Sequence, residues 1–168
     1  MRSLYFKSIF CALVILCAQF SFIQHAGAQD AAQQKIDEQK LQEYFTKNNI
    51  HPLKGPGGLY YTIAKEGTGP KILAGSSVTI NYTGKLLDGK VFDSNTDPAF
   101  RHMQPFTVEI GVGRVIQGWD KGVQLLKKGS VATLYIPSGM GYGPGGSGGS
   151  IPPNSVLIFD VEVISFSK

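Results

Sequence analysis

The sequence predicts an α+β domain in which an antiparallel β-sheet curls around one short α-helix, with a further helix in front of it. Five segments alternate between apolar and polar residues with the two-residue period of half-buried strands. One segment among them, residues 116–126, repeats its apolar residues at helical spacing instead. Glycine, with 21 of the 168 residues, supplies the turns that such a sheet needs.

Residues 1–28 have the pattern of a signal peptide and are expected to lie outside the fold. Arg2 and Lys7 give a positive start, an apolar run follows over residues 8–23, and Ala26-Gly27-Ala28 is a cleavage motif. An uncleaved anchor helix is the alternative. We expect export, to the periplasm or else to the medium, and no membrane span after processing.

Composition excludes several classes of function for the mature chain. Both cysteines, Cys11 and Cys17, lie in the leader, so neither disulfides nor thiol chemistry is expected. Without Arg2 and Lys7 the chain keeps 14 basic and 12 acidic residues, a balance that gives little support to nucleic-acid binding. No cysteine cluster or H-x-x-H pair offers a metal site, so we expect neither metal nor cofactor.

Residues 29–50 predict an N-terminal helical extension, followed by a Pro- and Gly-rich linker over residues 51–58. Good helix formers dominate it, and Ile36, Leu41, Tyr44 and Phe45 make a partial apolar stripe. The stripe could pack on the following domain or on a second copy, as a homodimer through residues 30–49. A solvated spacer is the third possibility.

Residues 59–168 form the predicted domain. An Asp88-Gly89 turn separates two of the strands. The inward apolar positions of the five strands are Leu59, Tyr61 and Ile63; Val78, Ile80 and Tyr82; Phe106, Val108 and Ile110; Leu134 and Ile136; and Leu157, Phe159, Val161 and Val163. The helical segment carries Ile116, Trp119, Val123 and Leu126, and Gly129 follows near a C-cap position. The only tryptophan, Trp119, would therefore point into the concave side of the sheet.

Aromatic residues gather on these inward positions. Three rings fall on strands, Trp119 falls on the covering helix, and Phe92 and Tyr142 lie near turns. A plain aromatic core explains any one of them, but a small sheet around one helix has little depth for so many rings. We therefore expect some of them to line a cleft for a compact apolar group. The long loop over residues 141–155 borders the domain's edge.

Three stretches, VTINYTGKLLDGKVFDS, VIQGWDKGVQLLKKG and GYGPGGSGGSIPPNSVLIFDVEVI, resemble the FKBP-type peptidyl-prolyl cis–trans isomerases. The resemblance covers Gly58 to Ser167, with its motifs in order. It implies an enzyme that isomerises X-Pro bonds without a cofactor, in proline-containing polypeptides, and that can bind macrolides of the FK506 type. The leader and the N-terminal helix are similar to those of exported bacterial members.

The resemblance also implies a site. It places Trp119 as the floor on which a proline ring rests, the Ile116 N–H as a donor to a bound carbonyl, and Asp93 and Tyr142 on a polar rim. The implied catalytic residues are Asp93, Tyr142 and Phe159, and the implied substrate-binding residues are Tyr82, Phe92, Phe106, Val115, Ile116, Trp119 and Ile151.

This chain departs from the family pattern at three places. Strict alternation puts Asp93 and Phe92 on opposite faces, so both reach the cleft only if the strand is bulged or ends there. Residues 94–105 form a longer segment than in minimal members. Ser147 stands where many members have His, and Ser150 where an apolar residue is common.

We expect the protein to assist the folding of exported proteins as a prolyl isomerase. A non-catalytic chaperone or binding module that uses the same cleft is the alternative, and a scaffold that dimerises through the N-terminal helix is a third hypothesis.

Overall fold

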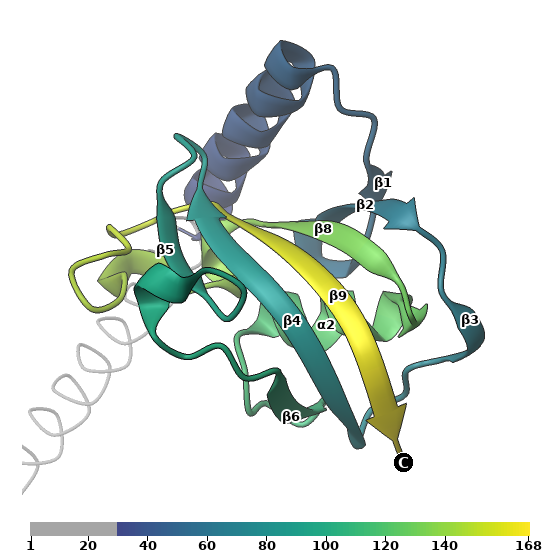
Figure 1. Ribbon diagram of the computed structural model, residues 1–168. Coiled ribbons are helices and arrows are strands. Elements are labelled where there is room, and N and C mark those ends of the chain that lie inside the picture. The colour runs from purple at the N-terminus through teal and green to yellow at the C-terminus, as the bar shows by residue number, and fades with distance from the viewer. Residues whose placement is uncertain (1–29) are drawn as a thin grey trace, which may run out of the picture.

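The computed structural model describes residues 30–168; the predicted signal peptide, residues 1–28, lies outside this range. Residues 30–48 are helical, and the rest is a curled sheet with one short helix in its concave side (Figure 1). No helix among the described residues is long and apolar enough to cross a membrane. The strands are β1 (Leu53–Lys54), β2 (Tyr60–Lys65), β3 (Thr68–Lys71), β4 (Ser76–Leu86), β5 (Val91–Ser94), β6 (Phe106–Ile110), β7 (Lys127–Lys128), β8 (Val131–Ile136) and β9 (Leu157–Ser167).

The main sheet is antiparallel throughout and has the order β1-β2-β8-β9-β4-β5, with β6 paired to the same side of β4 as β5. Its longest ladder joins β4 and β9, from Ser77 opposite Ser167 to Leu86 opposite Leu157. β3 and β7 form a separate two-stranded sheet. The Asp88-Gly89 turn joins β4 to β5 as expected, with Gly89 at φ +87°. This architecture confirms the predicted fold class.

The covering helix is shorter than its apolar spacing predicts. α2 spans Gln117–Gly122 and continues as a 3₁₀ turn over Val123–Leu125. At Leu126 the backbone becomes extended, because the chain enters β7 at the next residue. Gly129, at φ +80°, therefore lies in the turn between β7 and β8 and does not cap the helix. A Cβ at Gly122 would lie 2.8 Å from the Leu134 side chain. The two glycines of α2 therefore let it lie close against β8.

Alternation of apolar and polar residues in the strands predicts a polar outer face, but the structure corrects this, because apolar side chains are buried on both faces of the sheet. On the concave face, α2 and the inward strand positions make the main core. On the outer face, Leu41 and Phe45 of the N-terminal helix are buried against Tyr60, Tyr135 and other apolar residues. The Phe45 ring packs edge-on, with centroids 5.3 Å from Tyr60 and 5.0 Å from Tyr135. The apolar stripe of the helix thus packs on its own domain, except for Ile36, which is 47% exposed.

Candidate functional site

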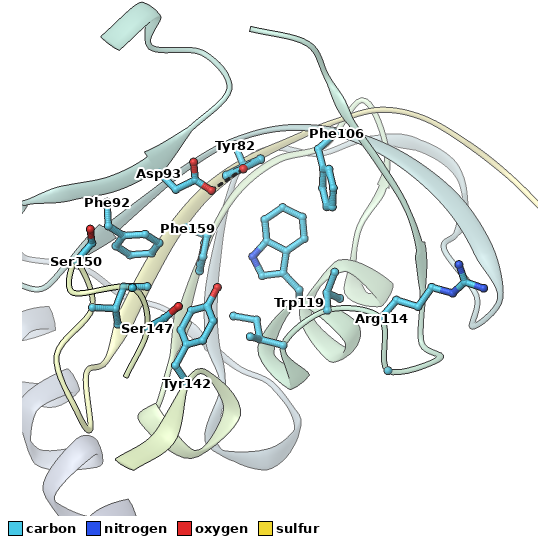
Figure 2. Close-up of a pocket in the computed structure, with 15 residues that line it drawn as sticks. Tyr82, Phe92, Asp93, Phe106, Arg114, Trp119, Tyr142, Ser147, Ser150 and Phe159 are labelled. Carbon is cyan, nitrogen blue, oxygen red and sulfur yellow. Dashed lines mark hydrogen bonds between the residues drawn. The ribbon is translucent and has the colours of Figure 1, made fainter. Parts of the chain in front are cut away.

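A cleft of about 720 Å³ opens on the concave side of the sheet, beside α2 (Figure 2). Every site residue named from the sequence lines it. The predicted lining residues are Tyr82, Phe92, Asp93, Phe106, Val115, Ile116, Trp119, Tyr142, Ile151 and Phe159, and the cleft adds Gly113, Arg114, Ser147, Gly148 and Ser150. The predicted residues thus share one cavity, although they come from four strands, α2 and two loops.

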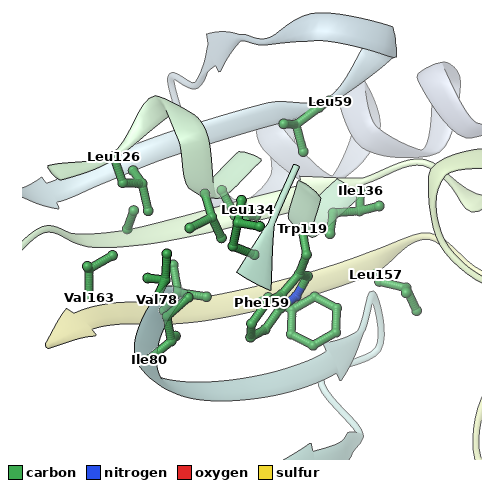
Figure 3. Close-up of a cluster of buried hydrophobic side chains, with 14 of the residues drawn as sticks. Leu59, Val78, Ile80, Trp119, Leu126, Leu134, Ile136, Leu157, Phe159 and Val163 are labelled. Carbon is green, nitrogen blue, oxygen red and sulfur yellow. The ribbon is translucent and has the colours of Figure 1, made fainter. Parts of the chain in front are cut away.

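Trp119 forms the floor of this cleft. The rings of Tyr82 and Phe159 stand nearly perpendicular to the indole, with centroids 5.3 and 5.4 Å away, and Phe106 lies at 6.2 Å. On its other side the indole joins the main core, so only 4% of the residue is exposed (Figure 3). Its buried Nε1 meets no hydrogen-bond acceptor among the described residues. The floor is therefore an apolar surface within a box of rings.

A β-bulge brings Phe92 and Asp93 to the same cleft. β5 pairs Asp93 with Gly84 but Val91 with the next residue of β4, Lys85, so Phe92 is the extra residue. The bulge is one of the two arrangements that the sequence allows if both side chains are to reach the cleft. Gly84 leaves room for these rings, because a Cβ there would lie 2.6 Å from the Phe92 ring and 2.7 Å from the Phe159 ring.

The polar rim centres on the Asp93 carboxylate. The Tyr82 hydroxyl donates to Asp93 Oδ2 at 2.7 Å, and His102 Nε2 lies 2.9 Å from Asp93 Oδ1. Burial, with the hydrogen bond to Asp93 and its charge, raises the pKa of Tyr82. Burial and the Asp93 charge also raise the pKa of Tyr142. Both phenols are thus held in the neutral form, in which they can donate a hydrogen bond.

Sequence reasoning missed His102, whose only signal was the added length of residues 94–105. Asn95, 2% exposed, fixes the start of this segment. Its side-chain oxygen accepts from the Tyr82 N–H at 2.7 Å, and its amide donates to the carbonyls of Ile80 and Gln104, each at 3.1 Å. Asn95 thereby joins the start of the long segment to β4 and to Gln104 near the segment's end, and the segment carries His102 to the rim.

The loop that leads into α2 is held by Asp120, a second residue missed from the sequence. The Asp120 carboxylate accepts from the N–H groups of Gly111 at 2.8 Å and Gly113 at 2.6 Å. Both glycines have positive φ, +82° and +78°. The Gly-Val-Gly stretch is therefore a turn fixed onto α2. It leaves the Ile116 N–H, which donates to no acceptor among the described residues, at the cleft.

Residues 137–156 form the wall that carries Tyr142. Tyr142 is 39% exposed, and its hydroxyl points into the cleft (Figure 2). Ser147 and Ile151 exchange two backbone hydrogen bonds, of 2.9 and 3.0 Å. This closed turn places Ser147 and Ser150 at the edge of the cleft.

The cleft holds one carboxylate and no metal-binding cluster: residues 30–168 contain no group of three or more His, Cys, Asp or Glu arranged to hold an ion. Arg114 lines the edge with its stem, while its Nε lies 3.3 Å from Glu109 Oε2. The arrangement is an apolar box with a few hydrogen-bond donors at its mouth. It can desolvate a compact apolar group and orient a carbonyl beside it.

Comparisons with known proteins agree with this geometry. The family model described as FKBP-type peptidyl-prolyl cis-trans isomerase matches residues 69–164. An FK506-binding protein of Neisseria meningitidis serogroup B is 46% identical over 108 residues, which are 64% of this chain and 95% of the relative. A probable FKBP-type peptidyl-prolyl cis-trans isomerase FkpA of the same organism is 37% identical over 151 residues, 85% of this chain and 53% of that protein.

Solved structures show the same fold. A peptidyl-prolyl cis-trans isomerase from Pseudomonas syringae pv. tomato superposes with a TM-score of 0.68 at 32% identity, covering 82% of this chain and 95% of that one. The crystal structure of AtFKBP13 gives a TM-score of 0.62 at 37% identity, covering 70% of this chain and all of the other.

Proposed function

The chain belongs to the FKBP-type peptidyl-prolyl cis-trans isomerase family, and from this premise we propose that the cleft over Trp119 is where it isomerises X-Pro bonds. The substrate proline ring lies on the indole face, between Tyr82, Phe106 and Phe159. The observation that carries the proposal is the floor itself: a nearly buried Trp that lines the cleft, with three rings standing steeply tilted to it at 5.3–6.2 Å.

The reaction needs no nucleophile and no proton transfer. Rotation about the X-Pro bond is slow because amide resonance gives it a barrier of about 18–20 kcal/mol. A thousandfold to millionfold acceleration requires about 4–8 kcal/mol of differential stabilisation. Water stabilises the dipolar planar amide more than the twisted transition state, in which resonance is lost. An apolar box that removes water from the imide carbonyl therefore lowers the barrier.

The polar groups at the mouth orient the substrate. The Ile116 N–H is free to donate to the carbonyl of a bound peptide. The Tyr142 hydroxyl is a neutral phenol, whose pKa burial and the Asp93 charge raise further, and it is a second donor for the rotating carbonyl. Asp93 acts mainly by positioning Tyr82: its carboxylate accepts from the Tyr82 hydroxyl and keeps that ring nearly perpendicular to the Trp119 indole. Phe159 supplies the wall between the floor and Phe92.

A protease-coupled assay of an X-Pro peptide with the mature chain tests the catalytic role. We expect isomerisation to accelerate and Trp119 fluorescence to change as a proline-mimicking ligand saturates the cleft. A folded chain that binds such a ligand without accelerating the reaction would instead support the alternative, a non-catalytic chaperone or binding module. Saturable binding with constant Trp119 fluorescence would show that the ligand does not contact the indole.

We further propose that the protein is exported, to the periplasm or the medium, where proline-containing polypeptides need isomerisation to fold. The signal-peptide pattern of residues 1–28 supports this. Cell fractionation with mass spectrometry of the mature N-terminus tests it: cleavage after Ala28 is expected, and an intact leader in the cytoplasmic fraction would contradict it. A macrolide of the FK506 type is expected to compete with the peptide for the cleft.

A homodimer through residues 30–49 would have to use the helix face that carries Ile36, because Leu41 and Phe45 are buried on the same chain. Light scattering of the mature chain and of Ile36→Glu tests this arrangement. Twice the chain mass in the parent, lost in the variant, would establish the dimer.

A further inference from the structure

The N-terminal helix carries a buried carboxylate whose partner is in the cleft wall. Asp37 is 1% exposed. Its Oδ2 accepts from both the backbone N–H of Ser138, at 2.7 Å, and the Ser138 hydroxyl, at 2.6 Å, while Oδ1 accepts from Gln33 at 2.9 Å. A buried carboxylate is costly unless hydrogen bonds satisfy it, and bonds to a charged acceptor are stronger than neutral ones. Three donors meet that requirement.

Ser138 begins the segment that carries Tyr142. It opens the 3₁₀ turn Ser138–Met140, and its carbonyl accepts from the Gly141 N–H at 3.0 Å. Met140 donates to the Pro137 carbonyl at 2.9 Å. Only this short hydrogen-bonded turn separates the Asp37 carboxylate from Tyr142, so a shift at Ser138 is passed to the Tyr142 ring.

The same helix also holds the other end of this wall. Val156, which closes the loop of residues 137–156, is buried in the cluster with Leu41 and Phe45. The next member of that cluster, Ile158, precedes Phe159, whose side chain points to the opposite face and lines the cleft. One face of the helix thus contacts both ends of the loop and the outer side of β9.

We infer that Asp37 is a positioning residue for the isomerase site: by holding Ser138, it sets where the Tyr142 wall stands over the Trp119 floor. The inference rests on the proposed function of the cleft. Leu41 and Phe45 already supply apolar contact that docks the helix, and apolar contact has no direction. The carboxylate, in contrast, accepts two hydrogen bonds from a single residue and so fixes the position of its backbone.

The test compares Asp37→Ala with Glu38→Ala. Glu38 is the neighbouring carboxylate on the same helix, and its hydrogen-bond partners among the described residues are Tyr60 of β2, at 2.5 Å, and Gln42 of the helix, at 3.1 Å. For Asp37→Ala we expect amide hydrogen exchange over residues 138–151 to speed up about tenfold and kcat/KM to fall about three- to tenfold. Glu38→Ala should leave both within about twofold. Ser138→Ala, which removes only the hydroxyl donor, is the milder variant should Asp37→Ala fail to fold.

A double-variant cycle separates positioning from general destabilisation. If Asp37 acts through Tyr142, Asp37→Ala will lower kcat/KM less in a Tyr142→Phe background than in the parent. Full additivity, or equal loop exchange in Asp37→Ala and Glu38→Ala, would overturn the inference. So would faster loop exchange with unchanged kcat/KM. A parent chain without isomerase activity would refute the proposed function, and the exchange comparison alone would then decide whether Asp37 holds the wall.

Discussion

One added methyl group at Gly84 tests whether the walls of the cleft are as closely packed as the structure shows. The Cβ of Gly84→Ala would lie 2.6 Å from Phe92 Cε2 and 2.7 Å from Phe159 Cε1, about 1 Å inside ordinary carbon–carbon contact. Neither ring can simply swing away, because Phe159 is packed against Trp119 and Phe92 is packed against Phe159. The rings must therefore move into the cleft or force the strands apart.

The expected magnitudes follow from this geometry. Overpacking of this kind costs about 1–3 kcal/mol. Gly84 is not among the glycines with positive φ, so alanine fits the backbone and returns about 0.4–1 kcal/mol by restricting the unfolded chain. The net loss is about 1–2 kcal/mol, which lowers Tm by about 3–7 °C for a folded chain of about 140 residues. Catalysis should suffer more, by about tenfold to a hundredfold in kcat/KM, because a displacement of about 1 Å moves two walls of the cleft.

Circular dichroism melting and the protease-coupled assay measure the two effects on Gly84→Ala. The matched control is Gly139→Ala, where a Cβ meets nothing within 4 Å, so stability and kcat/KM should hold. Replacing Phe92 by Leu in the Gly84→Ala background removes the ring atoms nearest the methyl and should recover part of the lost stability. Parent-like Tm and kcat/KM in Gly84→Ala would refute the close packing and the proposed role of these walls.

Four further outcomes are expected. Tyr142→Phe should lower kcat/KM about tenfold with little change in Tm, since its hydroxyl bonds to nothing among residues 30–168; unchanged turnover would remove it from the mechanism. Asp93→Asn should lower the pKa of Tyr82, as measured by tyrosinate absorbance, because a charge that favours the neutral phenol is lost. No shift between the tyrosinate titrations of the parent and of Asp93→Asn would contradict this. In the parent, the raised pKa keeps the proton on Tyr82 at a pH where the unfolded chain has ionised, so the free energy of unfolding falls as pH rises above about 10; a free energy of denaturant unfolding that stays constant above about pH 10 would argue against it. Leu41→Ala should cost about 2–4 kcal/mol in denaturant unfolding, and a smaller effect would mean that the helix is loosely docked.

The strands were predictable because burial of one face imposes alternation on the sequence. Val78, Ile80 and Tyr82 follow that pattern on β4, and α2 follows the helical one. The outer face was mispredicted because the N-terminal helix covers Tyr60 and Tyr135, and alternation within a strand does not show whether another element covers its outer face. The length of α2 was overestimated because the spacing of apolar residues does not mark where the backbone leaves the helical conformation and becomes extended.

The lining of the cleft was predicted through family motifs, whereas the groups that hold it in place were not. His102 reaches Asp93 from a loop, and Asp120 reaches back to two glycine N–H groups. Asn95 and Asp37 likewise bind backbone groups of other elements. Polar residues in loops have no period, and their partners are chosen by tertiary structure. No local pattern distinguishes them from solvated residues.

These buried polar side chains divide the cleft into three independently held walls. Asn95 holds residues 94–105, Asp120 holds the turn before α2, and Asp37 holds the Tyr142 loop. A reaction that uses no nucleophile depends on a dry cavity of fixed shape, and loops keep a fixed shape only when their backbone groups are bound. Because no anchor shares a hydrogen-bond partner with another, their effects on catalysis should add as free energies across walls. Within one wall, as for Asp37 and Tyr142, the effects of two substitutions on kcat/KM should not be additive.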